Sequence, residues 1–141
     1  HHTIYLSQRY EAHLNAIERH HALPDSPSLY LHNPSLIDPT FAPDGMSSLY
    51  VLVPVAHMHE RLDWSEAAAG YRETVLDRLI DLGLPDLRPR IRSETACTPA
   101  DWQASMGLYK GATFSLAHSL DQMLSLRPHS AAASYMVRAS A

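Results

Sequence analysis

Glycine and cysteine are scarce in this chain of 141 residues, which contains five glycines and one cysteine. The five glycines form no Gly-x-Gly-x-x-Gly pattern, so the chain lacks the turn that holds a dinucleotide pyrophosphate at a helix start. Cys97 has no second cysteine with which to form an internal disulfide, which is typical of a reducing compartment. No catalytic base stands beside Cys97 in the sequence, and we expect it to pack as a small structural thiol.

Long apolar runs and basic clusters are also missing. No apolar run approaches the roughly 18 residues that span a bilayer, although contact with a membrane surface stays open. The net charge is −4 at pH 7 and the arginines are scattered, so nucleic acid is not an expected partner. A hydrophobic fraction of 45% with 18% charged residues favours one soluble globular domain.

Apolar spacing and turn residues predict an α+β fold with helices flanking a sheet. The second and third strands are not separated by a helical crossover, so we expect the sheet to be mixed or antiparallel. Residues 107–134 give no clear pattern. The predicted strands cover residues 2–6, 28–32, 48–56, 88–95 and 134–137, and the predicted helices run from Ser7 to near His21, from Asp63 to Gly83, and onward from Thr98.

Two of these helix starts carry recognisable capping residues. Asp63-Trp64-Ser65-Glu66 has the form of a capping box, in which Asp63 accepts from an amide three residues on and Glu66 reaches back. In Thr98-Pro99-Ala100-Asp101, proline occupies the first turn, where its missing amide costs nothing. The first of these helices should pack through an apolar stripe of Trp64, Ala68, Tyr71, Val75 and Leu79.

Ten histidines raise the possibility of a metal site. His57 and His59 are the best pair, because alternate residues of a strand point to the same face. A third ligand cannot be placed from the sequence, and His20 and His21 diverge if they lie on a helix. We therefore assign no metal ligands and interpret these histidines as surface residues near loops.

Several short motifs follow one another along nearly the whole chain. They are Thr3-Ile4-Tyr5-Leu6 with Arg9-Tyr10, Ser28-Leu29-Tyr30-Leu31-His32-Asn33-Pro34, Ala42-Pro43-Asp44-Gly45, Tyr50-Val51-Leu52-Val53-Pro54-Val55-Ala56-His57, Leu62-Asp63-Trp64, Thr98-Pro99-Ala100-Asp101-Trp102, Gly111-Ala112-Thr113-Phe114-Ser115 and Arg127-Pro128-His129. Together and in this order, they resemble the bacterial phytoene desaturases, a branch of the amine-oxidase-like flavoproteins.

The resemblance implies FAD-dependent removal of hydride and proton from a C40 polyene, phytoene. It also implies that this chain is an internal piece of the substrate domain of a larger flavoprotein, peripheral to the inner membrane on the cytoplasmic side. A start at His1-His2 without Met agrees with an internal piece, although these two histidines could be a tag remnant. Arg138 replaces a glycine that the family places beside the flavin, so we expect no FAD binding and no activity from this piece alone.

Catalytic residues cannot be assigned within the chain. We expect the polyene to contact Gly111, Phe114, Pro128 and His129, and the apolar residues from Phe114 to Leu126 to line a tunnel or, equally, to form an ordinary core. The alternatives are a related carotenoid oxidoreductase, namely a diapophytoene desaturase or a ketolase, and a non-enzymatic lipid-binding or interaction module. Unpaired strand edges at both ends also predict self-association of the piece as a symmetric dimer.

Overall fold

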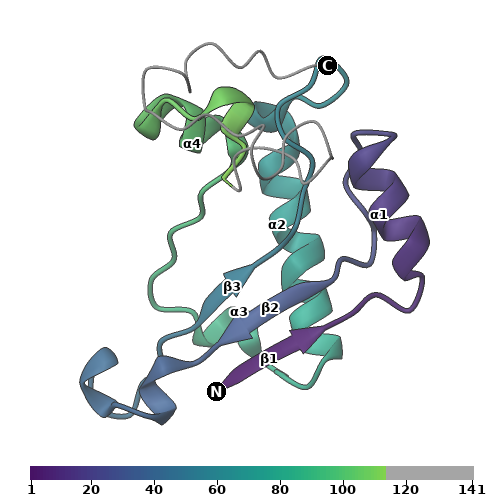
Figure 1. The fold of residues 1–141 in the computed structure, drawn as a ribbon. Helices are drawn as coiled ribbons and strands as arrows, with labels where there is room; N and C mark the ends of the chain where they lie inside the picture. The colour runs from purple at the N-terminus through teal and green to yellow at the C-terminus, as the bar shows by residue number, and fades with distance from the viewer. Residues whose placement is uncertain (114–141) are drawn as a thin grey trace, which may run out of the picture.

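A computed structural model describes residues 1–113 of the chain (Figure 1). The predicted strand at 134–137 and the predicted contacts Phe114, Pro128 and His129 lie outside the described residues. The strands are β1 (His2–Tyr5), β2 (Leu29–His32) and β3 (Tyr50–Leu52). The helices are α1 (Tyr10–Glu18), α2 (Trp64–Asp81), α3 (Leu87–Arg90) and α4 (Pro99–Met106), with the 3-10 turns η1 (Pro34–Leu36), η2 (Pro39–Phe41) and η3 (Tyr109–Gly111).

The three strands form one antiparallel sheet in the order β1-β2-β3. Ile4 lies opposite Tyr30, which in turn lies opposite Leu52. The predicted α+β class and the antiparallel alternative for the sheet are both confirmed. The strand predicted over 48–56 is shorter than expected, because Pro54 cannot donate to the ladder and pairing ends at Leu52.

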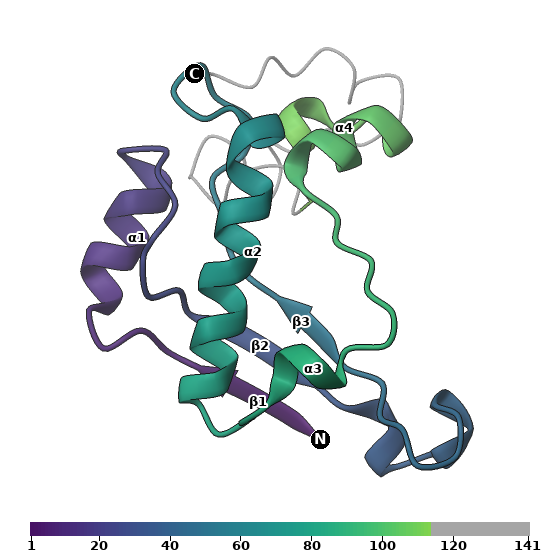
Figure 2. The ribbon, with the colours of Figure 1, turned by 180° about the vertical axis from the view of Figure 1, so that it is seen from behind.

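One face of the sheet is covered by α2, which crosses it from end to end, with α3 beside it (Figure 2). The core on this side is formed by the buried residues Leu29, Leu76 and Leu79. Alternate strand residues share a face, and Leu31 and Val51 accordingly pack against the same core. These burials hold the sheet to α2 by removing apolar surface from water, at about 25 cal/mol per Å².

The predicted start of α2 is confirmed, but Asp63 caps it without the predicted capping box. The carboxylate of Asp63 accepts from the Ser65 amide at 2.8 Å and from the Ser65 hydroxyl at 2.6 Å, two residues on rather than three. The predicted stop is also confirmed, because Leu82 caps the helix and Gly83 follows with φ of +107°. Of the predicted stripe, Trp64 and Leu79 are buried.

Helix α1 is shorter than predicted at both ends. Ser7 is buried and its amide donates to the Ser28 hydroxyl at 2.9 Å, so the helix begins at Tyr10 instead. It ends at Glu18, before His21, whose φ is +49°. The most buried residue of α1 is His13, 4% exposed, which lies three residues from Tyr10 on the predicted apolar side.

The strand predicted over 88–95 is wrong. Residues 87–90 form α3, and the segment after it is held to α2 by side chains rather than to a sheet edge. Arg88 pairs with Asp77 at 2.8 Å, and Glu94 accepts two bonds from Arg72 at 2.6 and 2.7 Å. Two of the charged residues in this alternation, Arg88 and Glu94, therefore serve as ion-pair partners of α2.

Cys97, which we expected to be packed inside, is exposed. It lies in the irregular segment before α4, where no core forms around it. The helix start at Thr98 is confirmed and carries a full capping box. The Asp101 amide donates to the Thr98 hydroxyl at 3.3 Å, and the Thr98 amide donates to the Asp101 carboxylate at 2.7 Å.

Among the helices of the described part, none combines the length and the apolar character that crossing a bilayer requires.

Candidate functional site

The sheet face turned away from α2 is a surface to which all three strands contribute. Its residues alternate with those that pack on α2. In Figure 1 this face is turned toward the viewer, and no described helix crosses it. We call it the open sheet face and define it by His2, Ile4, Tyr30, His32, Tyr50 and Leu52.

Exposure differs across the open sheet face. Ile4 is 70% exposed and Tyr50 is 53% exposed, both high values for large apolar side chains in strands. Tyr30, on the central strand β2, and Leu52, at the end of β3, are half-buried by their neighbours. An exposed apolar patch spread over neighbouring strands is typical of a ligand or partner surface, whereas single exposed apolar residues are not.

Aromatic rings join the strands across this face. The rings of His2 and His32 stack with centroids 4.2 Å apart and 12° between their planes. Tyr30 and Tyr50 meet edge to face at 6.1 Å. The Tyr30 hydroxyl and Nδ1 of His2 share a hydrogen bond of 2.6 Å, so the most polar atom at the centre of the face already has a partner.

One imidazole of the face, that of His2, is uncharged at neutral pH. Desolvation lowers the pKa of His2, and the neighbouring His32 and the N-terminal amine lower it further. A lowered pKa keeps this imidazole uncharged at neutral pH. At His2 the face can therefore contact an apolar ligand without placing a charge against it.

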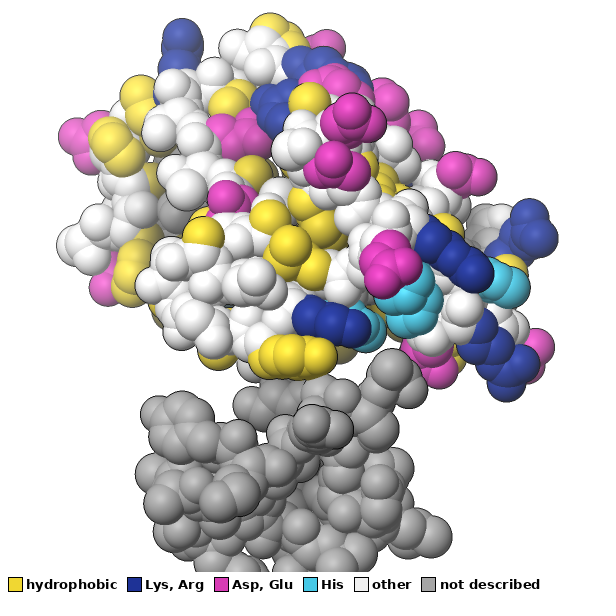
Figure 3. All heavy atoms as spheres, turned by 90° about the horizontal axis from the view of Figure 1, so that it is seen from above, with side chains coloured by type: hydrophobic (Ala, Val, Ile, Leu, Met, Phe, Trp, Pro, Cys, Tyr) yellow, Lys and Arg dark blue, Asp and Glu magenta, His cyan; other side chains and the backbone are white. Residues whose placement is uncertain are grey.

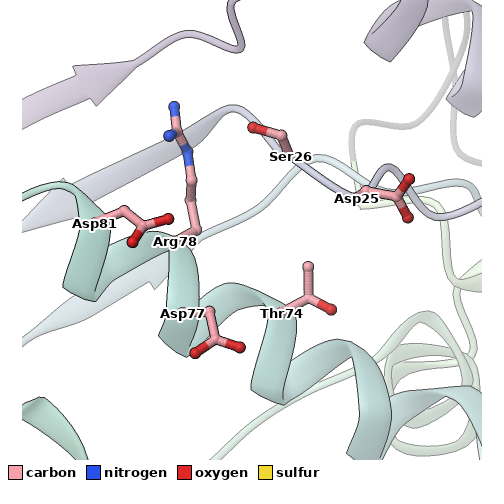
Figure 4. Close-up of a pocket in the computed structure, with 6 residues that line it drawn as sticks. All are labelled: Asp25, Ser26, Thr74, Asp77, Arg78 and Asp81. Atoms are coloured by element: carbon pink, nitrogen blue, oxygen red, sulfur yellow. The ribbon is translucent and has the colours of Figure 1, made fainter.

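A second feature is an open polar hollow of about 320 Å³ between α2 and the segment before β2 (Figure 4). Its carboxylates flank one guanidinium, and burial together with the Asp25 charge raises the pKa of nearby Tyr71. Such a lining suits water and ions rather than an apolar ligand. The lining residues are Asp25, Ser26, Thr74, Asp77, Arg78 and Asp81.

The structure brings three histidines into contact, whereas the sequence predicted only the pair His57 and His59. His57 and His59 lie in the loop after β3 rather than in a strand, and His21 joins them from the segment after α1. The rings of His21 and His59 stack 4.0 Å apart at 9°, and the His57 ring meets His21 edge to face at 5.3 Å. Sequence analysis did not identify His21 as the third histidine, because no sequence pattern indicates a contact between residues so far apart in the chain.

Gly111, the one predicted substrate contact within the described residues, is buried and has φ of +69°. A Cβ atom there would lie 2.0 Å from the carbonyl oxygen of Pro99, so only glycine fits this packing of η3 on α4. This gives Gly111 a structural role. Its contact with a substrate, like those of Phe114, Pro128 and His129, stays a prediction.

No protein-family model matches the chain. Curated proteins do match it along nearly its whole length. It is 44% identical over 130 residues, or 92% of the chain, to a 4,4'-diapophytoene desaturase (4,4'-diapolycopene-forming) of Methylomonas sp, and 38% identical over the same share to a phytoene desaturase (lycopene-forming) of Pseudescherichia vulneris. A phytoene desaturase of Neurospora crassa is 39% identical over 139 residues, or 93% of the chain.

The chain spans about a quarter of the length of these relatives, 25%, 26% and 23% respectively. The resemblance to phytoene desaturases that the sequence phrases predict is confirmed, and it extends to the diapophytoene desaturases. The activities in the relatives' names belong to chains about four times as long as this one.

Proposed function

We propose that the protein containing this chain is a carotenoid desaturase, and that the chain forms part of the wall of its substrate site. The observation that carries the proposal is the 44% identity over 92% of the chain to a protein named as a desaturase of 4,4'-diapophytoene. Another relative, from Myxococcus xanthus, is named an all-trans-zeta-carotene desaturase. All these names describe removal of hydrogen from an acyclic, apolar polyene.

The open sheet face is the part of the chain that we assign to this polyene. A long hydrocarbon offers no hydrogen bonds, so its affinity must come from burial of apolar surface, at about 25 cal/mol per Å². Ile4 and Leu52 supply aliphatic contact and Tyr50 supplies a flat ring. Because the Tyr30 hydroxyl is bonded to His2, the hydrocarbon would not leave that polar group unpaired.

The resemblance implies FAD, which accepts a hydride when bound. The helix starts of the described part do not suit its pyrophosphate. Asp63 already accepts from the Ser65 amide in α2, and Thr98 accepts from the Asp101 amide in α4. The start of α1 has no side-chain cap, but Glu11 lies in its first turn. Each first turn also carries an acidic side chain, which would repel a pyrophosphate. In this proposal the flavin is held by other parts of the protein, and this chain positions the polyene.

The proposal also includes contact with a membrane, for the same chemical reason. An acyclic polyene partitions into a bilayer, so the enzyme must reach it from the membrane surface, and a cytoplasmic, peripheral location remains our prediction. Self-association of the isolated chain also remains a prediction. The length of the polyene stays open, since relatives named for phytoene and for diapophytoene both match.

The proposal is tested by expressing the complete protein in a host that accumulates phytoene or diapophytoene and separating the extracted pigments by chromatography. New desaturated polyenes support it. Absence of conversion of either polyene by protein that carries flavin would contradict it and favour a related oxidoreductase such as a ketolase. Absence of flavin from the folded protein would favour a lipid-binding module.

The role of the open sheet face is tested by a matched pair of variants. Ile4→Glu puts a charge on the face, whereas Ile37→Glu puts the same charge on the η1–η2 excursion; the two isoleucines are 70% and 68% exposed. Burying an unpaired carboxylate against a hydrocarbon is strongly unfavourable, so Ile4→Glu should lower conversion by at least about tenfold. Flavin content should be unchanged. Equal loss in both variants, or in neither, would remove the polyene from this face.

A further inference from the structure

The three histidines after α1 and β3 belong to a larger group of basic side chains. Arg61 and Lys110 lie close enough to lower the pKa of His21, after its desolvation and the effect of His59. The backbone ties the parts together, because the Met58 amide donates to the Lys110 carbonyl at 2.9 Å. We call His21, His57, His59, Arg61 and Lys110 the basic cluster. Seen from above the molecule, His side chains lie beside Lys or Arg side chains and beside Asp or Glu side chains (Figure 3).

The backbone of the basic cluster is strained. Three non-glycine residues of the described part have positive φ, and two of them, His21 at +49° and Lys110 at +50°, belong to the cluster. A left-handed conformation is unfavourable for residues with a Cβ, and such strain concentrates at functional sites. The chain therefore tolerates two unfavourable conformations while holding these basic side chains together.

The cluster also carries positive charge without compensation from ion pairs. The four ion pairs of the described residues involve only Arg72 and Arg88, so neither Arg61 nor Lys110 has a carboxylate partner there. Glu60 stands between His59 and Arg61 but pairs with neither in the described part. In a chain of net charge −4, this group is a local exception. Nδ1 of His21 is also buried without a hydrogen-bond partner among these residues.

A metal ion does not suit this arrangement. The lone pairs of an imidazole lie in the plane of its ring, so the stacked rings of His21 and His59 direct theirs along parallel planes rather than to one point. Within residues 1–113, no group of three or more His, Cys, Asp or Glu side chains is arranged to hold a metal. Arg61 and Lys110 would, in addition, repel a cation.

We propose that the basic cluster binds a phosphate-type oxyanion, with an affinity that increases as pH falls. Arg61 and Lys110 supply permanent charge, and His57 and His21 supply donors that become charged on protonation. An anion stabilises the protonated imidazoles, so its binding is coupled to proton uptake. The groups around the anion would be the five basic side chains, with Glu60 as the nearest carboxylate in sequence. The inference does not depend on desaturase activity.

The experiment titrates the complete protein with inorganic phosphate and with pyrophosphate by calorimetry at constant ionic strength. The titrations are made at about pH 5 and about pH 7.5, because burial lowers the pKa of His21 and His57 below the ordinary histidine value of about 6.5. We expect saturable binding at the lower pH that weakens by about tenfold at the higher pH, because loss of one charge-assisted hydrogen bond has about that effect. Absence of saturable heat at the lower pH with both anions would overturn the inference.

Two matched pairs of variants locate the site. His57→Gln should weaken binding by about tenfold, whereas His20→Gln, next to the cluster but outside its ring contacts, should leave it unchanged. Lys110→Gly removes a charge and relieves a positive φ, so we expect it to weaken binding without lowering the melting temperature. Asp86→Gly relieves the same strain at φ of +58° away from the cluster and should leave binding intact. Unchanged binding in both His57→Gln and Lys110→Gly would place the anion elsewhere and overturn the assignment.

The source of the phosphate group is separated by vesicles. Binding of the protein to phosphatidylglycerol vesicles but not to phosphatidylcholine vesicles, lost in Lys110→Gly, would identify a lipid headgroup. Binding of soluble phosphate without vesicle binding would identify a soluble phosphorylated ligand. Either outcome supports the oxyanion site.

Discussion

Replacing Gly111 by alanine tests the closest packing found at any of the described glycines. Gly111 has φ of +69°, and a Cβ there would lie 2.0 Å from the Pro99 oxygen and 2.4 Å from its carbonyl carbon. Both are backbone atoms, so no flexible side chain can move aside. The contact is about 1 Å shorter than Cβ atoms tolerate, and η3 would have to move away from α4.

Gly107 supplies the control for this substitution. It has nearly the same φ, +66°, but nothing lies within 4 Å of the Cβ position. Gly107→Ala should therefore lower the free energy of unfolding by only the cost of the left-handed conformation, about 1 kcal/mol. Gly111→Ala bears the same cost plus overpacking, about 1–3 kcal/mol more. The difference between the two variants isolates the steric contact with Pro99.

The assay is urea unfolding of the complete protein, followed by tryptophan fluorescence, since Trp102 lies in α4 and reports on this region. We expect the midpoint to fall further for Gly111→Ala than for Gly107→Ala with equal slopes. Equal midpoints would refute the reasoning and leave substrate contact as the remaining explanation of Gly111. A large midpoint shift would establish a packing role, whatever the substrate does.

Two further predictions concern buried histidines. His13→Leu should raise the free energy of unfolding by about 1–2 kcal/mol, measured by urea titration. The reason is that it removes a 4% exposed side chain whose Nδ1 has no hydrogen-bond partner in the described part. A lower stability of the variant would show that Nδ1 does have a partner. Burial lowers the pKa of His13, His21 and His57 below the ordinary 6.5, so the unfolded chain binds more protons and stability should fall as pH drops through about 6.5. Thermal unfolding between about pH 7.5 and pH 5.5 checks this, and His13→Leu should flatten the dependence; a flat profile for the unmodified protein would contradict it.

Local rules made much of the fold predictable. The starts of α2 and α4 follow from capping side chains that act within three residues, at Asp63 and Thr98. The strands β1 and β2 follow from short β-rich runs bounded by turn residues. The wrong prediction of a strand at 88–95 also has a physical reason. Arg88 and Glu94 belong to a run of charged and apolar residues, but their ion-pair partners are on α2. Sequence alternation cannot distinguish an ion-pair partner from a solvent-facing strand residue.

The candidate surfaces were less predictable because they depend on contacts between distant residues. The open sheet face requires the register that places Ile4 opposite Tyr30, and Tyr30 opposite Leu52. The basic cluster requires His21 to meet a loop far along the chain. The sequence placed the substrate contacts at residues 111–129 instead, and of these only Gly111 lies within the described residues.

The resemblance to desaturases is carried in good part by residues that build the scaffold. One of the motifs that carry the resemblance contains β2, and another contains the helix cap Asp63. A third contains the Thr98 capping box, and a fourth contains Gly111, which packs on Pro99. Such residues fix how the sheet is made and covered, and they are indifferent to the length of a polyene. This explains physically why relatives named for phytoene and for diapophytoene match the chain alike. Under the proposed function, selection between the two polyenes must then depend on side chains that the scaffold does not constrain. On the open sheet face these are first of all Ile4 and Tyr50, because more than half of each is exposed.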